Sequence, residues 1–231
     1  KNTLKALFGR PSNTSSSSAI QDHRSSHSSK SVRSLPEPFV RPSLGLEQFF
    51  ANLESRDNLR ILDLSGASQA NINFVLQYGH HLYCENVIGT MENVFGTDED
   101  FYTRQADGHL SDQFLAETLS NLPGTFDGAL VWDILQFLQP PLLEHTVGYL
   151  HRVMEPGALL FAFFPSDEKL KWITMNNYRI ESAKSMKVSP RRNMRAPQYF
   201  NSRSLERLFG DFASVKFFLT RDHCREVIVR R

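Results

Sequence analysis

Residues 58–87, NLRILDLSGASQANINFVLQYGHHLYCENV, decide the fold of this chain. They read as an apolar strand, a turn, an amphipathic helix and a second short strand, which together make one βαβ unit. Asp63 closes the first strand, and Glu85 closes the second strand 22 residues later. That separation is close to the spacing at which a βαβ unit presents a carboxylate to a nucleotide ribose. The stretch therefore favours a site for a nucleoside-bearing cofactor.

The turn between the first strand and the helix is built from small residues, Ser65, Gly66, Ala67 and Ser68. Small side chains let a ligand approach the backbone closely, and the helix that follows begins with free N–H groups facing that ligand. The same pattern also occurs as ordinary punctuation in α/β proteins. Two interpretations of the turn are therefore open, a cofactor site and a purely structural connection.

The rest of the chain continues the alternation of strands and helices that a doubly wound sheet requires. The expected elements are a strand at 126–132, a helix at 140–154, a strand at 158–164, a helix at 202–209 and two final strands at 213–220 and 224–230. Three residues, 221–223, join the last two strands, and so short a connection forces an antiparallel hairpin. The pattern predicts an α/β fold with a mostly parallel sheet that ends in this hairpin.

Two further features refine the expected boundaries. Gly157 stands where the left-handed cap of the helix at 140–154 is expected. Near the start, Leu46, Phe49, Phe50 and Leu53 recur at helical spacing, and Pro42 with Ser43 provides a helix start. This first helix either covers the mouth of a site or packs on the sheet.

Three segments resemble the class I S-adenosylmethionine (SAM)-dependent methyltransferases. ILDLSGASQAN is similar to the first motif of that family, FDGALVWDILQFL to its fourth-strand motif, and LHRVMEPGALLFAFFP to the helix, PG turn and fifth strand that follow. The tail, YFNSRSLERLFGDFASVKFFLTRDHCREVIV, is similar to the last helix and the sixth and seventh strands. The resemblance covers about Leu59 to Arg231. It implies a Rossmann-like, seven-stranded sheet, SAM as the cofactor and methyl transfer as the activity.

The first motif departs from the family pattern of an acidic residue followed by three alternating glycines. Residues 63–69 keep the acid but only one glycine, Gly66, which is displaced by one position. Ser and Ala leave room for a methionyl tail, but they do not adopt positive φ as cheaply as Gly does. The alternative to an active enzyme is a catalytically inactive, methyltransferase-like binding or regulatory protein. A nicotinamide oxidoreductase is disfavoured because GxGxxG is absent.

The resemblance also implies which residues hold the cofactor. Asp63 and the backbone of the turn would hold the methionyl end, and Glu85 would accept hydrogen bonds from both ribose hydroxyls. Asp107 would follow a short third strand and accept from the adenine amine, and Trp132 would form a wall of the site. Each residue has a structural alternative: Glu85 as a surface carboxylate that caps a turn, Asp107 with Gly108 as a plain turn, and Trp132 as a core residue.

Methyl transfer itself asks little of protein side chains, because alignment of the acceptor and exclusion of water supply most of the acceleration. If a base is needed, the candidates are Asp133, His109 and Tyr199, in that order. Asp133 has the alternative of capping the helix that follows it. No metal-ligand spacing and no nucleophile triad is found in the sequence.

Composition supports the same class without identifying an acceptor. Lys plus Arg number 26 against 25 for Asp plus Glu, so no global field recruits nucleic acid or an anionic membrane. The two cysteines, Cys84 and Cys224, are expected to be free thiols in a reducing cytoplasm. No apolar run reaches the ~20 residues that span a bilayer. We therefore expect a soluble, cytoplasmic protein that acts on a small molecule, without a prediction of its oligomeric state.

Two segments stand apart in composition. Residues 1–41 are rich in serine, with 11 serines among residues 12–34, which predicts a disordered tail before a domain at 42–231. Residues 166–200 are too long for a simple crossover and carry eight cations against three acids. This basic insertion is interpreted either as a region that attracts an anionic substrate, RNA or an acidic partner, with nucleic acid disfavoured, or as a solvated loop.

Overall fold

The computed structural model describes residues 35–120, 122–167, 169–220 and 222–231. Its main sheet has six strands in the order β3-β2-β4-β5-β9-β8. These strands are β3 (His81–Cys84), β2 (Arg60–Asp63), β4 (Phe126–Trp132), β5 (Met154–Pro165), β9 (Cys224–Arg230) and β8 (Ser214–Leu219). The first four are parallel, and β9 runs antiparallel to both β5 and β8. The predicted Rossmann-like α/β sheet and its C-terminal antiparallel hairpin are confirmed.

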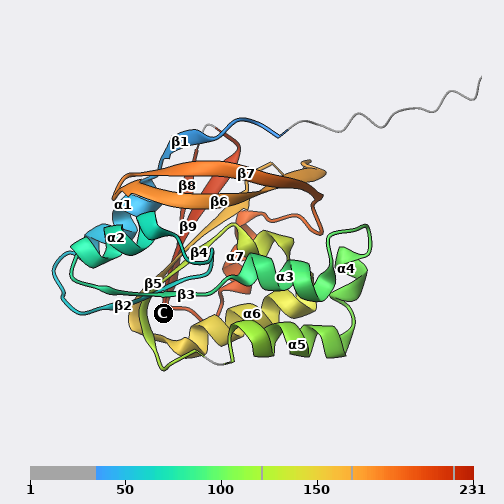
Figure 1. Ribbon diagram of the computed structural model, residues 1–231, viewed down its shortest axis with the longest axis horizontal. Helices are drawn as coiled ribbons and strands as arrows, with labels where there is room; N and C mark the ends of the chain where they lie inside the picture. The colour runs from blue at the N-terminus through green and yellow to red at the C-terminus, as the bar shows by residue number, and fades with distance from the viewer. Residues whose placement is uncertain (1–34, 121, 168, 221) are drawn as a thin grey trace, which may run out of the picture. The chain divides into compact units, whose positions relative to one another are not determined.

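Helices cover both faces of this sheet (Figure 1). One face carries α1 (Leu44–Ala51) and α2 (Gln69–Gln77), and the other carries α3 (Val87–Phe95), α5 (Gly108–Thr118), α6 (Pro140–Val153) and α7 (Ser202–Leu208). Because side chains alternate along a strand, the strands feed two separate cores. Ile61 and Leu130 belong to the core under α1 and α2, whereas Leu62 and Val131 belong to the core under the other helices.

The seventh strand of the predicted sheet is not confirmed, because the main sheet has six strands in the described residues. Where a third strand was expected, the chain forms α3, a short α4 (Phe101–Arg104) and α5. Asp107 does not follow a strand but is the N-cap of α5, where its Oδ1 accepts from the backbone N–H groups of His109 at 2.9 Å and Leu110 at 3.2 Å. An Asp-Gly pair begins a helix as readily as it follows a strand. Here the capping bonds of Asp107 favour the start of a helix.

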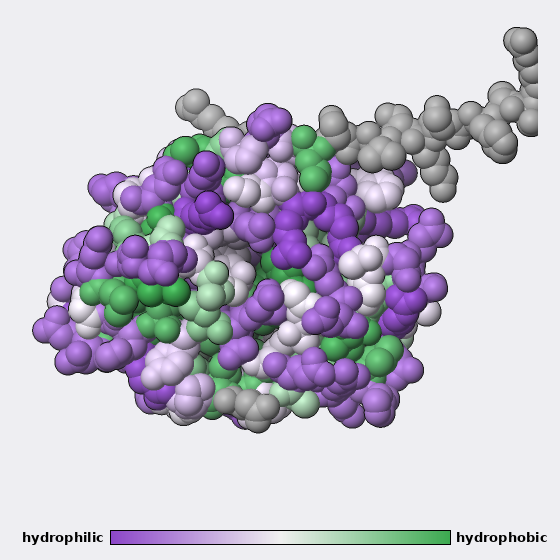
Figure 2. All heavy atoms as spheres, in the orientation of Figure 1, coloured by the Kyte–Doolittle hydropathy of each residue, from purple (hydrophilic) through white to green (hydrophobic). Residues whose placement is uncertain are grey.

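A second, three-stranded sheet has the order β1-β7-β6, with β1 (Phe39–Pro42), β7 (Ser185–Arg195) and β6 (Trp172–Ser182). The basic insertion is therefore mainly a β-hairpin and not a loop. Pro190 fits within β7 because it faces a register irregularity in β6 and lies beyond the part of β7 that pairs with β1. Hydrophilic groups gather over the region of β6 and β7, and the visible face has only small hydrophobic patches (Figure 2).

The predicted boundary between tail and domain at residue 42 falls inside the fold. β1 begins at Phe39, and Arg41 is 6% exposed. Its guanidinium pairs with Asp222 at 2.9 Å and with the buried Glu226 at 3.3 Å, so charge pairing and strand pairing both hold this segment. The predicted disorder of the serine-rich tail concerns residues 1–34, which lie outside the described residues.

The remaining boundary predictions differ only slightly from the structure. α1 begins after the N-cap Ser43, and Phe49 packs into the core on the sheet, within reach of Gly128. Gly157 has the expected positive φ of 82°, but α6 already ends at Val153 and Gly157 lies within β5. Cys84 and Cys224 are free thiols. Among the described residues, no helix is long and apolar enough to cross a bilayer.

Candidate functional site

The order of the strands places a topological switch point at the carboxyl ends of β2 and β4. β2 is followed along the chain by β3 on one side, whereas β4 lies on its other side. In open α/β sheets, ligands bind in the crevice outside such a point. The side chains at these strand ends are Asp63 and Trp132, so they define the centre of the candidate site.

Asp63 is fully buried and is held entirely by protein donors. Its Oδ1 accepts from the Ser65 backbone N–H at 2.9 Å, the Ser65 hydroxyl at 2.7 Å and the Trp132 indole N–H at 2.7 Å. Its Oδ2 accepts from the Asn71 amide at 2.9 Å. Burial raises the pKa of Asp63, and these hydrogen bonds oppose that increase. In this arrangement the Asp63 carboxylate fixes the turn and Trp132, whereas the sequence predicted that it holds the methionyl end of a ligand.

The turn after β2 lies against the end of β3. The Gly66 N–H donates to the Glu85 carbonyl at 3.0 Å, and Ser65 forms an isolated bridge with Asn86. Gly66 has a φ of +90°, a left-handed conformation that glycine adopts without a Cβ clash. Gly66, the single glycine in residues 63–69, therefore occupies the turn position whose φ is positive.

Glu85 lies beside this turn with a carboxylate that is available for a ligand. The side chain is half-buried, and within the described ranges it makes no hydrogen bond or ion pair. Burial raises its pKa. A half-buried acceptor without a protein donor is suited to a hydroxylated ligand that supplies the donors.

A cavity of about 490 Å³ opens at this turn. Its walls are residues 65–70 of the turn and the start of α2, together with Asn177, Tyr178 and Arg179 of β6. Its volume is within the range of about 300–1,000 Å³ that is usual for small-molecule sites. The N-cap of α2, Ser68, makes no side-chain capping bond, so the first N–H groups of the helix have no side-chain cap. Glu85 is not among the residues of this wall.

The hairpin covers the centre of the site. The ring of Tyr178 stacks on Trp132 with centroids 4.9 Å apart and an angle of 5° between the planes. Asn71 joins α2 to the hairpin, because its Oδ1 accepts from the Ile180 N–H at 2.8 Å and its amide donates to the Tyr178 carbonyl at 3.3 Å. Trp132 is fully buried, so in this structure it is a core residue, which is the structural alternative given for it above.

Asp133 lies next to this stack and is 1% exposed. Its Oδ2 accepts from the Asn176 backbone N–H at 3.2 Å and from the Asn176 amide at 3.1 Å. Its Oδ1 has no hydrogen-bond partner within the part of the chain that the structure describes. Burial raises the pKa of Asp133 to about 7, against the effect of the hydrogen bonds from Asn176 and from the Tyr178 side chain. The alternative role of capping the next helix is not seen, since Asp133 makes no capping bond to η1 (Ile134–Phe137).

The structure brings some of the predicted residues together and separates others. Asp63, the small-residue turn, Glu85, Trp132 and Asp133 all lie at the carboxyl ends of β2, β3 and β4. Asp107 and His109 lie at the start of α5, and Tyr199 is 57% exposed between β7 and α7. None of these three lines the cavity at the turn.

Sequence reasoning missed Asn71, Asn176 and Tyr178. Asn71 and Val75 are the two buried residues of α2, and their i, i+4 spacing on the apolar side of the helix was a signal for a buried polar group. Asn176, Tyr178 and Ile180 alternate along β6 with a period of two, which indicates a strand with one inward face. The sequence pattern indicated the inward face of this strand, but it did not indicate which residues of α2 and β4 that face contacts.

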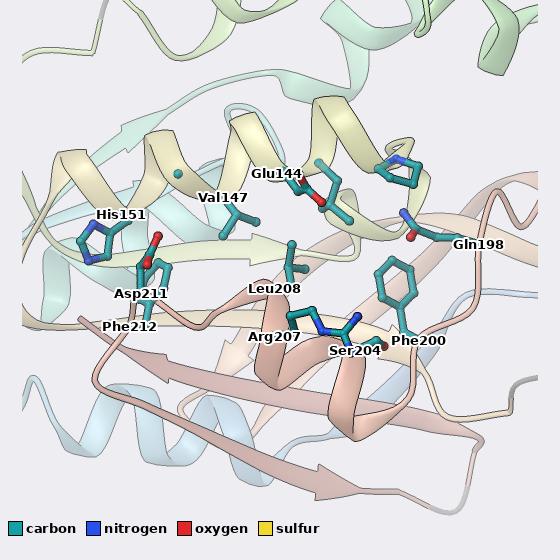
Figure 3. A pocket seen from close by; sticks show the side chains of 13 residues that line it. Glu144, Val147, His151, Gln198, Phe200, Ser204, Arg207, Leu208, Asp211 and Phe212 are labelled. Atoms are coloured by element: carbon teal, nitrogen blue, oxygen red, sulfur yellow. The ribbon is translucent and has the colours of Figure 1, made fainter.

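Three further cavities lie outside this centre, and one of them, of about 630 Å³, lies beside β1 and the start of α1. Another, of about 810 Å³, is bounded by residues 97–99, 101 and 102 and by the ends of the hairpin, with Lys171, Trp172 and residues 192–195. The third, of about 410 Å³, lies between α6 and α7 (Figure 3). There Glu144 and His151 extend from α6 toward the side of Arg207 and Asp211, and no residue predicted from the sequence takes part.

No protein-family model matches the sequence, and no curated protein matches it. Among solved structures, a Burkholderia thailandensis 1,6-didemethyltoxoflavin-N1-methyltransferase with bound 1,6-didemethyltoxoflavin and S-adenosylhomocysteine is similar, with 14% identity, a TM-score of 0.45, and coverage of 81% of this chain and 76% of that chain.

Two others are similar to the same extent. A magnesium protoporphyrin IX methyltransferase from Synechocystis with bound SAM has 14% identity, a TM-score of 0.41, and coverage of 81% of this chain and 80% of that one. A SAM-dependent methyltransferase from Clostridium acetobutylicum has 11% identity, a TM-score of 0.44, and coverage of 80% and 90%.

Proposed function

We propose that this chain binds S-adenosylmethionine at the carboxyl ends of β2 and β3 and transfers its methyl group to a small-molecule acceptor. The observation that carries the proposal is the arrangement at the switch point. A turn of small residues, a carboxylate without a protein partner and an uncapped helix N-terminus lie together there. A nucleoside with a hydroxylated sugar and an anionic end complements these groups.

Each group has a role in holding the cofactor. Glu85 accepts hydrogen bonds from the ribose hydroxyls. The first N–H groups of α2, with Arg179 across the cavity, receive the carboxylate of the methionyl end. Asp63 acts indirectly, because its bonds to Ser65 and Asn71 keep the turn in a shape that leaves the backbone open.

S-adenosylmethionine supplies a methyl group on a sulfonium, which is already an activated leaving group. The remaining task of the protein is to orient the acceptor, exclude water and, for a protonated acceptor, take a proton. Asp133 is suited to the last task, because its Oδ1 has no partner in the described residues and its pKa of about 7 lies near neutral pH. His109 and Tyr199 remain weaker candidates, since neither lies at the strand ends.

The 810 Å³ cavity at the end of the hairpin is the proposed place of the acceptor. Lys171, Arg192 and Arg195 contribute cations to it, and Trp172 contributes an aromatic wall that is 53% exposed. Of the two acids in its wall, Asp98 is already paired with Arg104 at 2.8 Å. These features favour an anionic acceptor.

One observation favours the second candidate, a methyltransferase-like binding protein without transfer activity. The stacked rings of Trp132 and Tyr178 fill the space at the ends of β2 and β4, and they lie beside the enclosed Asp133. A protein fixed in this state would hold a nucleoside at the turn and bring no acceptor to it.

Calorimetric titration with S-adenosylhomocysteine tests the proposal. We expect saturable binding, weakened roughly 10- to 100-fold by Glu85→Ala, since a charged acceptor for two hydroxyls is lost. Glu206→Ala, on the exposed side of α7, is the matched control and leaves the affinity unchanged. Absence of heat with the unaltered chain, or equal affinities of the two variants, would overturn the proposed site.

A further inference from the structure

The hairpin of β6 and β7 is fastened to the edge of the main sheet through one face of β6. Tyr178 stacks on Trp132 at the end of β4, and Ile180 donates its N–H to Asn71 of α2 at 2.8 Å. Asn176 donates twice to Asp133, at 3.2 and 3.1 Å. Three inward residues at alternate positions thus make three separate attachments across the switch point.

The backbone at the middle attachment is strained. Trp132 has a φ of +57°, which is an outlier for a bulky side chain. The conformation is held by the bond from its indole to Asp63 at 2.7 Å and by the ring of Tyr178. Strain of this kind is concentrated at ligand clamps and switch regions, where the surroundings force it.

The attachments also enclose a group with unused bonding capacity. Asp133 is 1% exposed and accepts from the Asn176 amide with its Oδ2, whereas its Oδ1 has no hydrogen-bond partner in the described part of the chain. A buried carboxylate oxygen without a donor is costly, and it is satisfied only if the cover is removed or a donor enters.

We propose that Tyr178 and Trp132 form a latch that holds the hairpin down over the carboxyl ends of β2 and β4, and that the latch opens when an adenosyl cofactor binds. The inference rests on the proposed function. The arrangement described here is the latched state, in which a cofactor reaches the turn but not Asp133. In the unlatched state the Tyr178 ring has left Trp132, and Asp133 faces the ligand. A cofactor shifts the equilibrium because it contacts the turn in both states, whereas it contacts the end of β4 only in the open state.

The chain has two tryptophans, so fluorescence can follow the latch directly. Trp172→Phe leaves Trp132 as the single reporter, and S-adenosylhomocysteine is the probe. We expect the emission of Trp132 to change on binding, because the indole leaves a buried stack. We also expect the observed binding rate to level off at high probe concentration, because opening of the latch then limits the rate.

Variants in this background test the role of the Tyr178 ring. Tyr178→Ala removes the stack and should raise the affinity and the association rate about tenfold or more. The reason is that binding then no longer includes the free-energy cost of breaking the stack to reach the open state. Tyr178→Phe keeps the stacked ring and removes only the hydroxyl, which accepts from Asn176 at 3.4 Å and bonds the Asp133 carboxylate, so its affinity should lie close to that of the parent and far from that of Tyr178→Ala. Tyr149→Ala, which removes a tyrosine from α6, is the matched control.

The outcomes separate the latch from the proposed function. If calorimetry detects the probe but the Trp132 emission is constant and Tyr178→Ala equals its control, the latch is wrong and the proposed function stands. If neither the parent nor Tyr178→Ala binds the probe, both are wrong. Should Tyr178→Ala fail to fold, the measurements on the parent alone test the latch. A binding rate that rises linearly with probe concentration without a plateau, together with constant Trp132 emission, contradicts the latch.

Discussion

The carboxylate of Asp133 gives the site a pH dependence whose sign follows from its burial. Its folded-state pKa of about 7 lies above the ordinary value near 3.8, so the folded protein holds this proton more tightly than the unfolded chain does. The stability that the proton provides is present at low pH and is lost as pH rises toward about 7.

Asp133→Asn should therefore stabilise the protein at pH 8, by up to about 4 kcal/mol from the size of the pKa difference, and the gain should disappear near pH 4. The amide oxygen still accepts from Asn176, so the variant keeps the attachment. Urea unfolding at several pH values measures the difference from the unaltered chain. Asp112→Asn, at an exposed position of α5, is the control, and an equal gain at pH 4 and pH 8 would contradict the explanation.

Asn71 illustrates why a single buried amide can matter as much as a motif. It bonds Asp63 at 2.9 Å and the Ile180 N–H at 2.8 Å while fully buried. Asn71→Ala leaves a buried acceptor and a buried donor without partners, so we expect a loss of roughly 2–4 kcal/mol of unfolding free energy. Asn73→Ala, an exposed asparagine on the same helix, should change stability by less than about 0.5 kcal/mol. Similar losses in chemical denaturation would show that Asn71 has no special part in the site.

At the scale of elements, β1 is held by a charge pair across the two sheets. Arg41 reaches the fully buried Glu226 at 3.3 Å, and the Gly45 N–H donates to the same carboxylate at 2.7 Å. Arg41→Ala would leave Glu226 as a buried charge without its cation, which should cost about 3–5 kcal/mol. Adding Glu226→Gln should recover part of this loss, because the neutral amide needs no cation. If the double variant is no more stable than Arg41→Ala in urea, the charge of Glu226 is not the cause.

The elements that the sequence predicted well are those with a complete local signal. The alternation of apolar strands and amphipathic helices predicted β2, α2, β3, β4 and α6 close to their observed bounds, and the short link at 221–223 predicted the terminal hairpin. The absence of the expected third strand was not predictable, because the local sequence of Asp107 and Gly108 is equally compatible with the start of a helix and with the end of a strand. β1 was also missed, since its four residues are ordered by pairing with β7, more than 140 residues away in sequence.

The candidate site was predictable in part for the same reason. Asp63, the turn and Glu85 belong to one βαβ unit, so their proximity follows from local structure. Their roles did not follow, because Trp132 and Tyr178 come from separate elements and their stack decides what faces a ligand. A stretch that looked like a basic loop is the hairpin that supplies Tyr178, and only the tertiary fold places it over β4.

At the scale of the whole molecule, the sheet positions two sets of residues along one edge. Glu85 and the turn lie at the ends of β2 and β3, whereas Asp133 and the hairpin lie at the end of β4. Methyl transfer needs both sets to meet one cofactor, since alignment supplies most of the acceleration. The account therefore depends on whether an adenosyl ligand occupies this edge.

A crystal structure of the chain grown with S-adenosylhomocysteine tests this claim most directly. We predict electron density for the ligand along the turn at residues 65–68, with its ribose on the Glu85 carboxylate and the Tyr178 ring displaced from Trp132. Crystals that hold the ligand elsewhere, or that show Glu85 without a ligand at saturating concentration, would contradict the account.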